Sequence, residues 1–195
     1  MKHRKTEPAL DRLLGGIPPD ASIVVYGPPG CGKSRLCLRW ASLLGPSAVL
    51  SREMGPVELA RTLSTCGARS DRLMVAPSVE VAAASVRRGL VVSVVVDSVQ
   101  RLGPGELPQV LGAARAGVWW LISHVNAAGR AKGTTDASHD CSAVLSVSPA
   151  EPGRARVTIE KTRLGGASGL SELFDLAPEA PQKKAASKPV RGRQR

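Results

Sequence analysis

The sequence predicts an α/β fold in which a mainly parallel sheet is flanked by helices and extended by antiparallel strands at its C-terminal end. Short apolar runs alternate with helical patterns along most of the chain. These runs are apolar throughout, as is typical of strands buried on both faces of a parallel sheet. Further along, two strand-like segments flank a Pro/Gly turn, and such a pair indicates an antiparallel hairpin.

The expected elements follow the chain in order. A short apolar strand at residues 23–26 precedes a glycine-rich loop, and an apolar-periodic helix at 35–44 leaves it. Further strands are expected at 48–50, 73–76, 90–96 and 118–122, with intervening helices at 57–65, 79–88 and 107–116. The hairpin would join strands at 143–147 and 156–160 through a turn at 149–153. No internal repeat interrupts this order.

Length and composition favour one domain, residues 1–177, followed by a basic tail, 178–195. A chain of 195 residues with 43% hydrophobic content can bury one substantial core. The cysteines, at 31, 37, 66 and 141, form neither a CxxC pair nor a zinc spacing, and no apolar N-terminal segment suggests secretion. No apolar run approaches the roughly 18 residues of a membrane span. We therefore expect a soluble cytoplasmic protein with reduced thiols and no membrane partner.

The net charge of +11 is concentrated at the chain ends. Residues 1–7 contribute +2 and residues 178–195 contribute +5, which leaves +4 for the rest. The tail lacks a hydrophobic set, so we expect it to be disordered. Two interpretations remain open for it: an electrostatic arm that holds nucleic-acid phosphate, or a solubilising extension.

The glycine-rich loop at residues 27–34, called the phosphate loop below, fits the phosphate-binding pattern G-x-x-x-x-G-K-[ST] at every fixed position. Glycines let a polyphosphate approach the backbone, whose N–H groups and the following helix N-terminus form an anion nest. Lys33 would reach the β- and γ-phosphates, and Ser34 would ligate Mg²⁺. The alternative is an ordinary Gly/Pro turn. The predicted nucleotide-binding residues are Gly27, Pro28, Pro29, Gly30, Cys31, Gly32, Lys33, Ser34 and Arg35.

Two acidic residues follow strands at the edge of the sheet where ligands of open α/β folds bind. Asp97 ends an apolar strand and is our candidate for orienting Mg²⁺, unless it only caps the next segment. The next residue is Ser98 rather than an acid, so the base that activates water must come from elsewhere. Glu53 is the best placed acid if its strand neighbours the phosphate-loop strand; otherwise it is a solvated acid at a helix start.

Five segments resemble RecA-like ATPases, and within them the bacterial RadA/Sms branch of DNA repair proteins. They are Leu10-Asp11-Arg12-Leu13-Leu14-Gly15-Gly16-Ile17 ("LDxxLGGG"), Ser51-Arg52-Glu53 ("SGEE"), Val96-Asp97-Ser98-Val99-Gln100 ("IDSIQ"), Ser123-His124-Val125 ("GHVTK") and Lys161-Thr162-Arg163-Leu164-Gly165 ("KNRFG"). The order is that of the family. Arg52 and Met54 replace a glycine and an acid of "SGEE", which puts partner docking and turnover rate in question.

The resemblance implies a RecA-like P-loop NTPase fold and roles for single residues. Glu53 would be the catalytic glutamate, and His124 a sensor near the γ-phosphate. Lys161 and Arg163 would be cations that reach across a subunit interface to the nucleotide of a neighbouring subunit. From the residues alone, His124 could equally be a structural histidine, and the two cations a solvated basic edge.

A DNA-facing loop is expected where the family carries one, at residues 126–135. Arg130 and Lys132 supply its positive charge, and it contains no aromatic residue. Without base stacking, contacts with single-stranded DNA would go mainly to phosphate and be sensitive to salt. A surface loop without this role is the alternative.

The leading hypothesis is a Mg²⁺-dependent ATPase of DNA repair or recombination that assembles as a homo-oligomer on single-stranded DNA. GTP is less favoured because no Asn-Lys-x-Asp segment follows the phosphate loop. One alternative is a nucleotide-dependent switch or adaptor with little turnover. Another is a small-molecule phosphotransferase, against which the chain offers no evident substrate lid.

Overall fold

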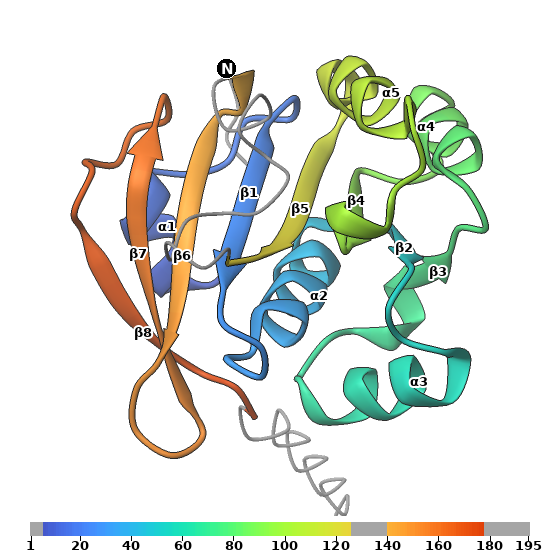
Figure 1. Cartoon of the computed structure of the whole chain (residues 1–195). Coiled ribbons are helices and arrows are strands. Elements are labelled where there is room, and N and C mark those ends of the chain that lie inside the picture. The colour runs from blue at the N-terminus through green and yellow to red at the C-terminus, as the bar shows by residue number, and fades with distance from the viewer. Residues whose placement is uncertain (1–5, 126–139, 178–195) are drawn as a thin grey trace, which may run out of the picture.

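The computed structural model describes residues 6–125 and 140–177, which form one eight-stranded sheet with helices on both faces (Figure 1). The strand order is β3-β2-β4-β5-β1-β6-β7-β8. The strands are β1 (Ser22–Gly27), β2 (Ser47–Ser51), β3 (Leu73–Val75), β4 (Ser93–Asp97), β5 (Val118–His124), β6 (Ala143–Pro149), β7 (Arg154–Thr162) and β8 (Ser171–Asp175).

The sheet is parallel from β3 to β6 and antiparallel from β6 to β8, which confirms the predicted architecture. The central strand β1 pairs with β5 on one side and β6 on the other. β4 is buried along its whole length, as expected for a strand covered on both faces. The edge strand β3 differs from the expectation, because Met74 and Val75 are exposed there.

The condition on which the choice of Glu53 depended is not met. β2, which leads to Glu53, does not lie beside β1, because β4 and β5 separate the two strands. β4 also begins later than expected, at Ser93, and the exposed Leu90 precedes it. The apolar run of residues 90–96 therefore combines a short connection with a strand, which periodicity alone could not separate.

The helices are α1 (Pro8–Leu14), α2 (Lys33–Leu44), α3 (Pro56–Thr65), α4 (Val79–Arg87) and α5 (Glu106–Ala113). Successive side chains of a strand point to opposite faces, so the sheet has two cores. Ile23 and Val25 join the core under α1, α2 and α3. Val24 belongs to the other core, under α4 and α5. No helix in the described part of the chain is long and apolar enough to cross a membrane.

Two elements were not among the expected ones. α1 begins with Pro8 in its first turn and ends at Gly15, whose φ of 71° is the left-handed conformation that glycine adopts readily. β8 adds the last strand and buries Phe174 against Trp40 of α2, with ring centroids 5.3 Å apart. The chain after β8 thereby returns to the helix that follows the phosphate loop.

Ser78 provides a local test of helix capping. Its side chain accepts a hydrogen bond from the backbone N–H of Val81 at 3.3 Å, at the start of α4. Ser78→Ala is expected to lower the free energy of unfolding by about 1 kcal/mol, measured by urea denaturation. Ser64→Ala, at an exposed serine inside α3, is the control and should change stability much less.

Candidate nucleotide-binding site

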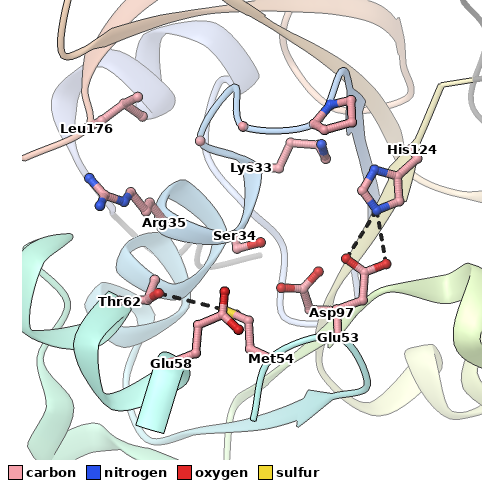
Figure 2. A pocket seen from close by; sticks show the side chains of 13 residues that line it. Lys33, Ser34, Arg35, Glu53, Met54, Glu58, Thr62, Asp97, His124 and Leu176 are labelled. Carbon is pink, nitrogen blue, oxygen red and sulfur yellow. Dashed lines mark hydrogen bonds and ion pairs between the residues drawn. The ribbon is translucent and has the colours of Figure 1, made fainter. Parts of the chain in front are cut away.

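A pocket of about 700 Å³ opens at the carboxyl ends of the parallel strands, between the phosphate loop and α3 (Figure 2). This is the size range of ligand sites and the edge where open α/β sheets bind ligands. Its lining residues come from the loop, α2, α3, the ends of β4 and β5, and the chain after β2 and β8. They are Pro29, Gly30, Gly32, Lys33, Ser34, Arg35, Glu53, Met54, Glu58, Thr62, Asp97, His124 and Leu176.

The glycines of the loop are required by its conformation and packing. Gly30 and Gly32 have φ of +74° and +96°, where other residues are strained. A β-carbon at Gly27 would lie 2.1 Å from the carbonyl oxygen of Val147. At Gly30 the same position is open, with no atom within 4 Å. Gly32 is the N-cap of α2 and has no side chain that could bond to the backbone N–H groups of the first turn. These groups can therefore bind an anion.

Lys33 lies inside the loop rather than extended into the pocket. Its ammonium donates hydrogen bonds to the carbonyl oxygens of Gly27, at 2.9 Å, and Pro28, at 2.8 Å. The residue is only 5% exposed. A bound polyphosphate would offer charged oxygens in place of these neutral carbonyls, and charge-assisted hydrogen bonds are the stronger kind. The Lys33 ammonium group therefore lies beside the anion nest, where a bound polyphosphate could replace its carbonyl partners.

Ser34 and Asp97 form the oxygen pair expected of a magnesium site. Asp97 ends β4 and is 2% exposed, and burial raises the pKa of its carboxyl group. A hydrogen bond with Ser34 acts against this rise in the pKa. Hydroxyl and carboxylate oxygens suit Mg²⁺, which completes its shell with water and substrate phosphates. Among the described residues no three His, Cys, Asp or Glu side chains gather as a metal site of their own.

Glu53, in the turn after β2, is held by Ser98, which follows β4, and by His124, the last residue of β5. The Ser98 hydroxyl donates to Glu53 Oε1 at 2.5 Å, and His124 Nε2 lies 2.9 and 3.1 Å from the two carboxylate oxygens. Burial by itself would raise the pKa of Glu53, but the hydrogen bonds from Ser98 and His124 outweigh it and lower the pKa. Glu53 is thus a carboxylate at neutral pH, and its charge contributes to raising the pKa of Asp97.

The structure brings Glu53 to the pocket although β2 is not next to β1. The ends of β4 and β5 lie between them and carry Asp97 and His124. Four adjacent parallel strands therefore end around one pocket, at the loop after Gly27, at His124, at Asp97 and near Glu53. Glu53 therefore lines the predicted pocket, although the strand neighbourhood on which the sequence argument depended is not the one observed.

Met54, Glu58, Thr62 and Leu176 line the pocket without having been predicted. Glu58 and Thr62 are four residues apart on α3, so they share a helix face, a spacing that could have indicated them once Glu53 was chosen. Leu176 follows β8 and packs on the loop, since a β-carbon at Gly32 would lie 2.4 Å from its Cδ2. No local pattern relates Leu176 to a loop so far away in the sequence.

The other predicted residues lie outside this pocket. Lys161 pairs with Val144 of β6, and the Arg163 N–H donates to the carbonyl oxygen of Ser142 at 2.8 Å. β6 begins opposite Ile23, at the start of β1, whereas the phosphate loop follows the end of β1, about 13 Å away along the strand. Arg130, Lys132 and the tail 178–195 lie outside the described residues.

The strand order and the loop after the central strand define the class of this fold, which is that of the RecA-like P-loop proteins. Among solved structures, that of the RadB recombinase is similar to this chain, with a TM-score of 0.64 and 24% identity. The similarity covers 86% of this chain and 93% of that one. No protein-family model and no curated protein sequence matches the chain.

Proposed function

We propose that this protein is a Mg²⁺-dependent ATPase of the RecA-like class that acts in DNA repair or recombination. The observation that carries the proposal is the convergence of the phosphate loop, the Ser34–Asp97 pair and Glu53 on one pocket. The sequence resemblance to RadA/Sms proteins and the structural similarity to a recombinase both favour this class.

The pocket supplies the groups that ATP hydrolysis needs. Backbone N–H groups from Gly30 onward would cradle the polyphosphate, and Lys33 would leave its carbonyl partners to neutralise charge on the β- and γ-phosphates. Glu53 would orient and deprotonate the attacking water. His124, in contact with Glu53, would sense the γ-phosphate. Ser34 and Asp97 would hold Mg²⁺, which supplies electrostatic stabilisation of the phosphate oxygens.

The position of Lys161 and Arg163 favours action on a neighbouring subunit. Neither lines the pocket of its own chain, and both lie toward the opposite end of the sheet. In a head-to-tail assembly, this end of one subunit would face the nucleotide edge of the next. We propose a homo-oligomer in which these cations complete the neighbour's site, while Arg130 and Lys132 contact single-stranded DNA phosphates and the basic tail adds electrostatic attraction.

A nucleotide-dependent switch with little turnover is the second candidate. Arg52 replaces the small residue of the family motif, and its guanidinium pairs with Glu106 of α5 at 2.9 Å. This pair ties the turn that carries Glu53 to a helix on the other face of the sheet. If the pair restrained Glu53, ATP would bind and order an oligomer without fast hydrolysis.

The proposed function is tested by steady-state ATP hydrolysis with and without single-stranded DNA, at low and high salt. We expect Mg²⁺-dependent hydrolysis, stimulated by DNA and less so at high salt. Tight ATP binding with ATP-dependent assembly but no turnover would instead identify the switch. Phosphate transfer to a small acceptor would identify the phosphotransferase.

Leu176 provides a test of how the nucleotide lies in the pocket. Figure 2 shows Leu176, Arg35 and Thr62 on the side away from His124. With the γ-phosphate directed toward Glu53, the base and ribose would extend toward Leu176. Leu176→Ala is expected to weaken ATP binding about 10-fold through lost apolar contact. Calorimetric titration with ATP and with inorganic tripolyphosphate, which has no base, measures the effect.

Tripolyphosphate binding should be unchanged in Leu176→Ala. Leu170→Ala, at a half-exposed leucine before β8, serves as the control and should bind both ligands normally. An equal loss of ATP and tripolyphosphate would show that Leu176 only supports the loop through Gly32.

A further inference from the structure

Ser98 is a completely buried polar residue beside the metal-site carboxylate. It directly follows Asp97 at the end of β4 and has no exposed surface. Its hydroxyl donates to Glu53 Oε1 at 2.5 Å, a bond that joins the end of β4 to the turn after β2. Asp97, the last residue of β4, and Ser98, which follows it, thus face two different parts of the site: Asp97 faces Ser34 and Ser98 faces Glu53.

The Glu53 carboxylate depends on partners from other segments, because its hydrogen bonds come from Ser98 and His124. Glu53 lies in a turn, with a side chain that is 28% exposed. A glutamate side chain in such a place has several accessible rotamers, and fixing one costs conformational entropy. A base that acts on water must be held within a few tenths of an ångström of its productive position.

The two partners of Glu53 differ in how firmly they are themselves held. His124 is 32% exposed and lies at the last position of β5. Ser98 is inaccessible and lies between the buried strand β4 and a short 3-10 turn, Val99–Arg101, whose Arg101 N–H donates to the carbonyl oxygen of Ser98 at 3.1 Å. Ser98 is therefore the rigid partner of the pair.

We infer that Ser98 is a positioning residue for the reaction proposed above, holding the Glu53 carboxylate in the orientation from which it activates water. This role rests on the proposed ATPase function. Ser98 does not line the pocket, so it acts through Glu53 and not on the nucleotide. Ser98, which follows β4, then positions an acid from the segment that follows β2.

A double-mutant cycle between Ser98→Ala and Glu53→Gln tests this inference under single-turnover conditions with the full-length protein. Ser98→Ala alone is expected to slow phosphate release about 10-fold or more, while ATP affinity is unchanged. In the Glu53→Gln background, Ser98→Ala should have little further effect, because the carboxylate that it positions is gone. If Ser98 had only a structural role, Ser98→Ala would slow phosphate release by the same factor in the wild-type protein and in Glu53→Gln.

Ser93→Ala is the matched control. Ser93 is also fully buried on β4, at its other end, where its hydroxyl lies 2.7 Å from Ser47 Oγ. This variant should hydrolyse ATP at the wild-type rate, with thermal unfolding recorded for all variants. The inference would be overturned if the rate losses of Ser98→Ala and Glu53→Gln multiplied in the double variant. It would also be overturned if Ser98→Ala released phosphate at the wild-type rate or faster. Absence of hydrolysis by the wild-type protein would overturn the proposed function first, so the two failures are distinguishable.

Discussion

Lys33→Ala is expected to reduce Mg²⁺-dependent ATP hydrolysis by at least about 100-fold, because it removes the positive charge beside the phosphates. In the structure the ammonium group is already within the loop, bonded to the carbonyl oxygens of Gly27 and Pro28. A small shift can move it from these carbonyls to phosphate oxygens. Steady-state phosphate release at saturating ATP measures the effect.

The control for Lys33 is its neighbour Arg35, which also lines the pocket and also carries a positive charge. Figure 2 shows Arg35 on the side of Leu176, away from Asp97 and Glu53. Arg35→Ala should therefore affect turnover far less than Lys33→Ala. Equal losses in both variants would mean that general positive charge, and not the position of Lys33, supports the reaction.

Glu53→Gln is expected to lower kcat by about 10²- to 10⁴-fold, because an amide cannot accept the proton of the attacking water. ATP affinity should be retained, since Glu53 faces the end of the pocket away from Leu176. Glutamine keeps the size of the side chain and can still accept a hydrogen bond from Ser98. Single-turnover hydrolysis and equilibrium binding of ATP, measured on the same preparation, separate the two effects.

Glu58→Gln is the matched control, because Glu58 is a second glutamate lining the same pocket, on α3. Ser98 and His124 bond to Glu53 and not to Glu58 in the described part of the chain, so loss of the Glu58 carboxylate should leave kcat nearly unchanged. If Glu58→Gln stopped hydrolysis and Glu53→Gln did not, the base would be on α3, and the assignment of Glu53 would be wrong.

Much of the fold could be predicted because its signals are local. The apolar runs around Val24, Val49 and Val95 are buried strands of a parallel sheet, and the glycine-rich loop lies between a strand and a helix. The strand predictions that failed concern features that are set by tertiary structure. The run at 90–96 looks uniform, yet only its later part pairs with neighbouring strands. β8 is short, and its one buried residue is Phe174, which packs against Trp40.

Some residues of the candidate site could likewise be predicted from local sequence, whereas others depend on tertiary structure. The phosphate loop and Asp97 are identified by their immediate neighbours in the sequence. Glu53 reaches the pocket because the sheet order places β4 beside β2, which a single sequence does not encode in any local pattern. Leu176 is distant from Gly32 in the sequence and meets it only through the return of the chain after β8.

The central claim is that this pocket hydrolyses Mg·ATP with Glu53 as its base. The most direct measurement is single-turnover release of γ-phosphate by the wild-type protein and Glu53→Gln, each with Mg²⁺ or with EDTA and with single-stranded DNA present. We predict release by the wild-type protein only with Mg²⁺, and ATP binding without comparable release by Glu53→Gln. Equal rates for the two proteins, or release that is unchanged by EDTA, would contradict the claim.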